Sequence, residues 1–371
     1  MELKNIYGVT LQLIAMHGSE RYQMDKILKE GEVSRLVERL LSQYQVFGPK
    51  RKGTGHVFDE IKSGSEIDLA YITTILPPKK YLLPQREKIL SFDPSKGIIP
   101  ERLEMQRKQL IFGIHSCDLN AFLLLDKVFI DKYPLPSYVE RRRNTVTVAL
   151  TCTEVDDACF CSSMGTGPSP DRGYDVLLTW LGDRYLAEAG SAEGEKILDL
   201  IEGGGAGEDD YKAKLKVIEN TKKKFRKKIN TEGLTEIIKE NLEHKIWDEL
   251  GELCLACAQC VMSCPTCYCF DVRDTLRLNL KEGFRFKEWD SCLLLEFAEV
   301  ALGGNFRSSR AARIRQFIGH NLGWGGASQY EDLNGRFKCV GCGRCIRVCP
   351  VHIDLTDVAS RLRGEVVAAS I

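Results

Sequence analysis

The chain has 371 residues, 43% hydrophobic and 28% charged, a composition typical of a soluble globular protein that buries a substantial core. Its 52 Lys and Arg residues balance 52 Asp and Glu residues, which gives no net bias toward nucleic acid. No apolar run is long enough to span a membrane, and residues 1–5 do not begin a signal peptide. We therefore expect a cytoplasmic protein, in which clustered cysteines are metal ligands or catalytic thiols rather than disulfides.

The N-terminal part of the chain has the pattern of an α/β domain. Residues 109–115 and 145–150 are short apolar runs that predict buried strands, and residues 119–130 between them predict a helix. Strand, helix and strand in this order imply a right-handed crossover between parallel strands. Residues 174–180 predict a third strand. We expect an α/β domain with a partly parallel sheet over residues 1–202.

A glycine-rich and then basic segment, residues 203–231, follows this domain. Residues 203–210 predict a flexible linker with an acidic end. Residues 212–228 contain nine Lys or Arg residues and one acid, Glu219. A basic helix leading into the next domain is the favoured interpretation, and a docking surface for an acidic partner or nucleic acid is the alternative. Residues 232–250 then predict one amphipathic helix.

Two cysteine runs in the C-terminal region carry the strongest motif. Both have the pattern C-x2-C-x2-C-x3-C-P, which is typical of two [4Fe–4S] clusters in which the last cysteine of each run serves the other cluster. The pattern assigns one cluster to Cys254, Cys257, Cys260 and Cys349. It assigns the other cluster to Cys339, Cys342, Cys345 and Cys264. Structural zinc is the alternative, but zinc sites usually use paired C-x2-C units rather than two runs of four.

A long insert separates the two runs. Residues 270–280, 293–302 and 309–322 within it predict helices, so we expect residues 232–371 to form a mainly α-helical dicluster ferredoxin-like domain. This arrangement resembles the helical dicluster ferredoxin domains of iron–sulfur subunits in respiratory and methanogenic enzymes.

A looser set of cysteines lies in the N-terminal domain. Cys117 and Cys152 each follow a predicted strand, and Cys159 and Cys161 come soon after on a loop. Because the carboxyl ends of parallel strands meet at one edge of a sheet, these four thiols predict a third [4Fe–4S] cluster. Buried packing of some of them and a redox-active disulfide are the alternatives.

Three cysteines remain outside these sets, namely Cys267, Cys269 and Cys292. Structural packing beside a cluster is the favoured interpretation for them. Iron ligation, with His320 completing a site, stays open, because imidazole can replace a thiolate at iron–sulfur centres.

The motifs together resemble a known family, the iron–sulfur β subunit of cytoplasmic hydrogenase/sulfur reductase (sulfhydrogenase), and are similar to the A subunit of anaerobic sulfite reductase. The matching segments lie between about residue 70 and residue 355, without departure in the motifs: residues 117–121, 159–168, 264–271, 289–292 and 339–350.

The resemblance implies an electron-transfer subunit of a multi-subunit oxidoreductase, without turnover of its own. It implies a flavoprotein partner that binds FAD and NAD(P)H, and a catalytic partner that acts on hydrogen, sulfur or sulfite. The main alternative is a self-contained reductase that acts on a sulfur compound at the N-terminal cysteines. A nucleic-acid-binding protein with structural clusters, suggested by residues 212–228, is disfavoured by the balanced charge.

Overall fold

A computed structural model describes residues 24–93, 95, 97–101, 103–278, 281–325 and 337–365. Residues 1–5, which bear on the signal-peptide prediction, and residues 279 and 280 of one predicted helix lie outside the described residues. No helix within the described ranges is long and apolar enough to cross a membrane.

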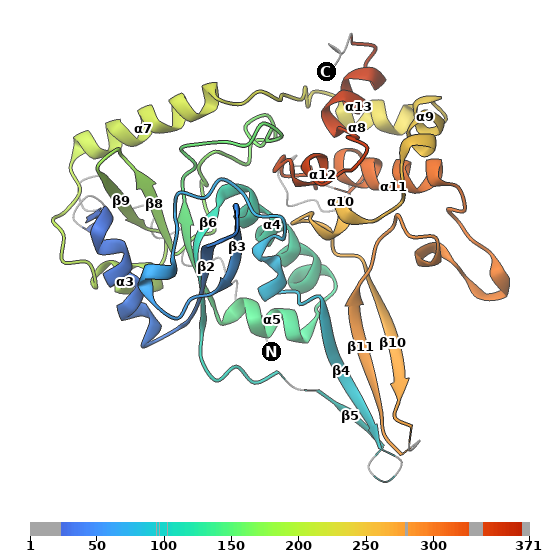
Figure 1. The fold of residues 1–371 in the computed structure, drawn as a ribbon, viewed down its shortest axis with the longest axis horizontal. Helices are drawn as coiled ribbons and strands as arrows, with labels where there is room; N and C mark the ends of the chain where they lie inside the picture. The colour runs from blue at the N-terminus through green and yellow to red at the C-terminus, as the bar shows by residue number, and fades with distance from the viewer. Residues whose placement is uncertain are drawn as a thin grey trace.

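A seven-stranded mixed sheet forms the N-terminal half, with strand order β1-β9-β8-β7-β6-β2-β3 (Figure 1). Its four central strands are parallel to one another, whereas β3, β9 and β1 are paired antiparallel to their neighbours. The strands are β1 (Lys26–Lys29), β2 (Gln45–Lys52), β3 (Gly55–Glu60), β6 (Gln109–His115), β7 (Thr145–Leu150), β8 (Val176–Trp180) and β9 (Arg184–Ala189).

The predicted parallel pairing of these two strands, with a helix between them, is confirmed. Strands β6 and β7 pair in parallel, from Gln109 opposite Thr145 to His115 opposite Leu150. Every residue of both strands is buried, as expected of central parallel strands covered on both faces. The connection between them is helical from Ser116 to Lys132. The helices of this half are α3 (Val33–Leu41), α4 (Ser116–Asp126), α5 (Pro136–Arg143), α6 (Ala192–Leu198) and α7 (Glu208–Lys223).

The prediction of a helix at residues 270–280 is wrong, because this segment begins a β-hairpin. Its apolar residues Phe270, Val272 and Leu276 lie at even spacing, which is the two-residue period of a strand. Strands β10 (Phe270–Leu276) and β11 (Gly283–Trp289) pair antiparallel. Strand β11 also pairs antiparallel with β4 (Arg86–Asp93), and β4 pairs antiparallel with β5 (Gly97–Pro100). Strands from both halves of the chain thus build one antiparallel sheet.

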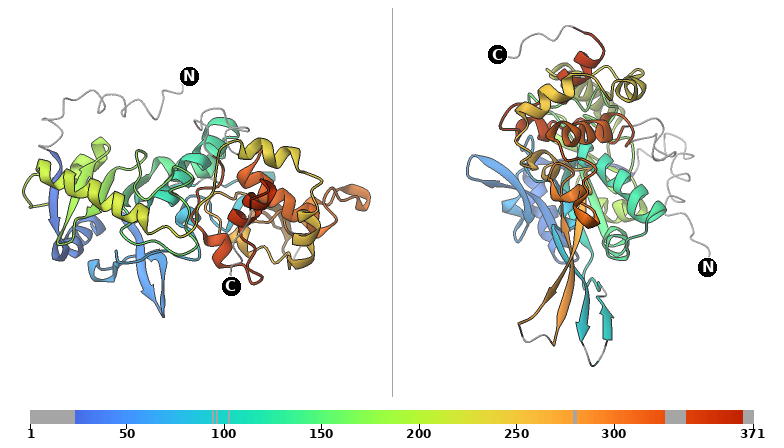
Figure 2. Two further views of the ribbon diagram at one scale, coloured as in Figure 1. Left: turned by 90° about the horizontal axis from the view of Figure 1, so that it is seen from above. Right: turned by 90° about the vertical axis from the view of Figure 1, so that its right-hand side faces the viewer.

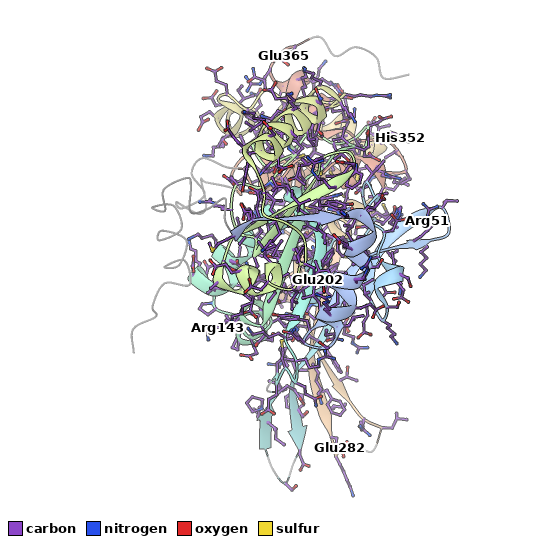
Figure 3. The ribbon with its side chains drawn as sticks, turned by 90° about the vertical axis from the view of Figure 1, so that its left-hand side faces the viewer. Arg51, Arg143, Glu202, Glu282, His352 and Glu365 are labelled. Atoms are coloured by element: carbon purple, nitrogen blue, oxygen red, sulfur yellow. The ribbon has the colours of Figure 1, made fainter. Side chains whose placement is uncertain are left out.

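This four-stranded sheet projects from the body as an arm (Figures 1 and 2). Glu282, labelled in Figure 3, marks its far end. Many side chains of β10 and β5 are exposed, including Leu276 and Ile98. The base of the arm is firmly anchored, because Trp289 donates from Nε1 to the carbonyl of Leu83 at 3.0 Å.

Short helices pack around a second hydrophobic core in the C-terminal half. They are α8 (Leu234–Glu240), α9 (Ile246–Leu253), α10 (Gln259–Met262), α11 (Arg310–Leu322), α12 (Arg344–Arg347) and α13 (Leu355–Leu362). The helix predicted at residues 309–322 is confirmed as α11. The helix predicted at 293–302 contains only short 3-10 turns, and the one predicted at 232–250 is divided into α8 and α9. Because of the hairpin and these turns, the C-terminal half mixes helices with strands.

The break between α8 and α9 has a local cause. Asn241 ends α8, where its side chain donates back to the carbonyl of Ile237 at 2.8 Å. The carbonyl of Asn241 in turn accepts from the indole of Trp247 at 2.7 Å, which fixes the turn between the two helices. Asparagine side chains compete in this way with continued helix.

The glycine-rich segment lies against the sheet rather than forming a loose linker. The amide of Ile27 in β1 donates to the carbonyl of Gly204 at 3.0 Å, and a Cβ on Gly203 would come within 1.9 Å of the Ile27 carbonyl. The absence of a side chain at Gly203 therefore permits the close approach of two backbones.

The basic run that follows forms most of α7 and then an extended segment. Its cations pair with acids of both halves: Lys214 with Glu188, Lys224 with Glu154, Arg226 with Asp157 and Lys227 with Asp354. The interpretation as a helix that leads into the next part of the chain fits these contacts better than a nucleic-acid surface.

Candidate cluster-binding site

The two cysteine runs of the C-terminal half share one backbone conformation. In each run the second and fourth residues after the first cysteine have a left-handed conformation: φ is 52° at Ala256 and 64° at Ala258, and 65° at Gly341 and 71° at Gly343. A short helix, α10 or α12, then carries the third cysteine. Left-handed residues turn the chain tightly, and alanine adopts them at a cost that the surrounding structure must offset. The cysteines of each run therefore line the inside of a single turn.

Backbone amides in these turns point at cysteine sulfurs. The amide of Ala256 lies 3.4 Å from Sγ of Cys254, and the amide of Gly341 lies 3.3 Å from Sγ of Cys339. The amide of Ile353 makes a similar contact with Cys349 at 3.3 Å. Hydrogen bonds of this kind stabilise negative charge on sulfur and help to set the potential of an iron–sulfur cluster.

The first predicted ligand set surrounds one cavity. Cys254, Cys257, Cys260 and Cys349 all line it, together with apolar side chains that include Phe317 and Leu355. We call this the outer cavity, because Cys257 is exposed at the protein surface. The structure thus brings together the three cysteines of one run and the last cysteine of the other, although ligation itself stays a prediction.

The second predicted ligand set surrounds a neighbouring cavity, here called the middle cavity. Cys264, Cys339, Cys342 and Cys345 line it. Cys345, Phe317 and Leu355 line both the outer and the middle cavities, so the two are separated by only one layer of side chains.

The four N-terminal cysteines also surround one cavity, the inner cavity. Cys117 follows β6 and Cys152 follows β7, and the loop that contains Cys159 and Cys161 closes over them. Cys342 of the middle set lines this cavity as well. The expected convergence of these four thiols at the carboxyl edge of the sheet is therefore present, and their role as cluster ligands remains a proposal.

Close backbone contacts hold the inner and middle sets together. The amide of Phe160 donates to the carbonyl of Gly341 at 2.8 Å, and the hydroxyl of Thr166 donates to the carbonyl of Val340 at 2.7 Å. A Cβ on Gly341 would stand 2.7 Å from the Cα of Cys161. Glycine is required at position 341 both by this approach and by its positive φ.

A buried ion pair joins the same two regions. Arg344, on α12, donates from both Nη atoms to the carboxylate of Asp118, at 2.6 and 2.8 Å. Its Nε also donates to the carbonyl of Thr74 at 2.7 Å. Asp118 directly follows Cys117, and Arg344 lies between Cys342 and Cys345. This bidentate pair therefore locks the orientation of the inner set relative to the middle set.

Two fully buried lysines lie beside the middle set. Lys79 donates to the carbonyls of Cys264, at 2.7 Å, and of Cys267. Nζ of Lys338 lies 3.5 Å from Sγ of Cys267. Burial works against the charge of Lys338, but the neighbouring sulfurs of Cys267 and Cys264 hold its pKa above the ordinary value. Buried ammonium groups are costly without nearby negative charge, and a thiolate-ligated cluster would supply that charge.

Burial keeps several of these thiols in the neutral form when no metal is bound. Burial raises the pKa of Cys152, Cys260, Cys339 and Cys345 above the ordinary range, so these groups are neutral at pH 7 unless a metal displaces the proton. No three His, Cys, Asp or Glu side chains in the described ranges close on a single metal ion.

The three remaining cysteines line none of these three cavities. Cys267 lies next to Cys264, and Cys269 and Cys292 share a hydrogen bond that lowers the pKa of Cys269. His320, at the end of α11, packs its ring edge-on against Tyr268 at 5.9 Å. Packing beside the middle cavity accounts for these positions, and ligation by them is a separate, untested prediction.

Sequence reasoning missed the charged residues of the site. Lys79, Lys338, Asp118 and Arg344 are all buried beside the cysteine sets. Asp118, Lys338 and Arg344 each lie within two residues of a predicted ligand, which is a signal that could have identified them. Lys79 is far from every cysteine in the sequence and carries no such signal.

Comparisons with known proteins agree with this geometry. Residues 253–353 match a family model described as a 4Fe–4S dicluster domain, which implies two [4Fe–4S] clusters. The chain is 35% identical over 329 residues to sulfhydrogenase 2 subunit beta of Pyrococcus furiosus, an alignment that covers 88% of this chain and 94% of that protein. No solved structure gives a significant match. The resemblance drawn from the motifs is confirmed.

Proposed function

The chain belongs to the family of sulfhydrogenase β subunits, and on that premise we propose that it relays electrons inside a multi-subunit oxidoreductase. In this proposal a flavoprotein subunit exchanges hydride with NAD(P)H, and a catalytic partner acts on hydrogen, sulfur or sulfite. The chain itself carries electrons between them without a substrate reaction of its own.

The observation that carries this proposal is the order of the three cavities. The outer and middle cavities share Cys345, and the middle and inner cavities share Cys342. Electron transfer between redox groups weakens steeply with distance, so centres whose cavities share a lining cysteine are well placed to exchange electrons. Three such centres in a row would form a continuous path from Cys257 at the surface to Cys152 at the edge of the sheet.

When bound, [4Fe–4S] clusters supply one-electron chemistry over a range of roughly −700 to +450 mV. The residues of this chain would hold them and tune them. The apolar side chains of Phe317 and Leu355 exclude water between the outer and middle cavities. Lys338, whose pKa is held above the ordinary value, places positive charge beside the middle set, which would favour the reduced, more negative state. A third [4Fe–4S] cluster at Cys117, Cys152, Cys159 and Cys161 is part of this proposal.

Replacement of Cys257 by Ser tests the relay. In the assembled complex, we expect coupled electron flow between the partner subunits to be lost, while each partner keeps its own half-reaction with artificial carriers. Glu208→Gln is the control, because Glu208 is an exposed carboxylate on α7 that lines none of the three cavities. Coupled flow retained by the Cys257 variant would contradict the proposal.

A further inference from the structure

A fourth and larger cavity opens beside the inner cysteine set. Its volume is about 420 Å³, within the range of roughly 300–1,000 Å³ that small-molecule sites occupy. It lies outside the carboxyl ends of β6, β7 and β8, where α/β sheets usually bind their ligands. His115, Cys152 and Glu154 line both this cavity and the inner cavity. A molecule held here would therefore lie against the end of the proposed electron path.

Aromatic rings form much of the wall of this cavity. Tyr71 stacks on His115 with ring centroids 4.1 Å apart and planes only 4° from parallel. The hydroxyl of Tyr71 donates to the carbonyl of Gly113 at 2.7 Å, which fixes the plane of the stack. On another part of the wall, Trp180 packs against Tyr185 at 4.8 Å. Fixed aromatic faces of this kind favour planar ligands and cations.

The charged residues of the wall are all acidic. Among the residues that the structure describes, Glu30, Asp68 and Glu154 line the cavity, and no Lys or Arg does so. Two of these three carboxylates have basic partners outside the cavity lining. His56 and Arg51 pair with Asp68, at 2.9 and 3.5 Å, and Arg51 projects outward at the edge of the molecule (Figure 3). Lys224 pairs with Glu154 at 2.5 Å.

The start of α3 adds no anion site to this wall. Val33 and Ser34, its first two residues, line the cavity. The 3-10 turn before them carries Glu30 and Glu32, whose carboxylates offset the positive end of the helix. The side chain of Glu32 also accepts the amide of Lys29 at 2.8 Å. Anionic sulfur species such as sulfite or polysulfide therefore meet an unfavourable site, which weighs against a sulfur reductase reaction at this position.

We propose that this cavity binds a planar aromatic electron carrier that is neutral or cationic. One electron passes between the ring of the carrier and the inner cysteine centre, and no bond forms or breaks. The electron-transfer part rests on the proposed function, whereas the binding part does not. Electrons would then enter or leave the chain at two different places. A small carrier would exchange them near Cys152, and a partner protein would exchange them at the surface near Cys257.

Methyl viologen, a planar dication, is a suitable probe, and anthraquinone-2,6-disulfonate, a planar dianion, is its counterpart. We expect calorimetry on the intact, oxidised, anaerobically purified chain to show one saturable methyl viologen site. We expect at least tenfold weaker binding of the disulfonate. Trp180→Ala should weaken methyl viologen binding about tenfold, through loss of the cation–π contact. Glu208→Gln, which removes an exposed carboxylate on α7, should leave it unchanged.

Equal iron content and circular dichroism of the Trp180 variant and the wild-type chain show that the fold is intact. Absence of a saturable methyl viologen site, wild-type affinity in a folded Trp180 variant, or tighter binding of the disulfonate would each overturn the proposal. Binding is measured without turnover, so these outcomes are independent of the Cys257 experiment. Loss of carrier binding with an intact relay, or the reverse, separates the two proposals.

Discussion

Replacement of Asp118 by Asn tests whether the buried ion pair with Arg344 holds the two cysteine regions together. The side chain of Arg344 is 3% exposed and that of Asp118 is 0% exposed. The substitution keeps the shape of residue 118 but removes its charge. It also turns an amide N–H group toward one of the two guanidinium donors, which now has no acceptor.

Breaking a buried pair by removing one partner costs about 3–5 kcal/mol, because the other charge stays buried without compensation. This is a large part of the roughly 5–15 kcal/mol that stabilises a typical domain. With a urea m-value of about 3 kcal/mol/M, the unfolding midpoint should fall by about 1 M or more. Removing both charges, in Asp118→Leu with Arg344→Met, should recover part of this loss.

Urea unfolding under anaerobic conditions, followed by far-UV circular dichroism, measures this shift. Asp274→Asn is the matched control. Asp274 forms an equally bidentate pair with Arg285, at 2.7 Å for both contacts, but the two side chains are 48% and 40% exposed on the arm. Exposed pairs contribute up to about 1 kcal/mol, so the control should shift the midpoint by less than about 0.3 M. Equal shifts in the two variants would refute the reasoning.

Three further predictions concern the cysteine sets. Gly341→Ala should destabilise the chain more than Gly53→Ala in the same urea assay. Both positions have positive φ, which costs alanine about 1–2 kcal/mol, but only the Cβ at 341 meets the backbone of Cys161, at 2.7 Å; equal effects would contradict the close packing. Cys152→Ser should lower iron and acid-labile sulfide from about 12 to about 8 per chain, and unchanged iron would exclude a cluster at the inner set. Exposure to air should bleach the brown absorption of the purified protein, whereas a colourless, air-stable protein would indicate zinc.

The cysteine pattern and the central strands could be predicted from the sequence because both depend on local chain geometry. Three thiols with two residues between neighbours fit one tight turn, and the repeated pattern predicted which cysteines line the outer and middle cavities, including the exchange of Cys264 and Cys349. The apolar runs of β6 and β7 predicted buried parallel strands. Since Cys117 and Cys152 follow those strands directly, their convergence also followed from the sequence.

The hairpin of β10 and β11 depended on the tertiary structure. Its strands alternate in polarity, but β11 is stabilised by pairing with β4, almost 200 residues earlier in the chain. Helix propensity within residues 270–280 gave no information about that partner. The same holds for Lys79, whose role beside Cys264 arises only when the two halves pack together.

The sequence by itself therefore determined which thiols gather in each set and, through the dicluster pattern, that two of the sets suit [4Fe–4S] clusters. Only the tertiary structure decided how the sets are connected. The shared positions of Cys345 and Cys342, the lock between Asp118 and Arg344, and the acidic aromatic cavity beside Cys152 all join segments that are distant in the chain. Ligand spacing is set within one turn of backbone, whereas the order of centres along a path depends on how separate elements pack.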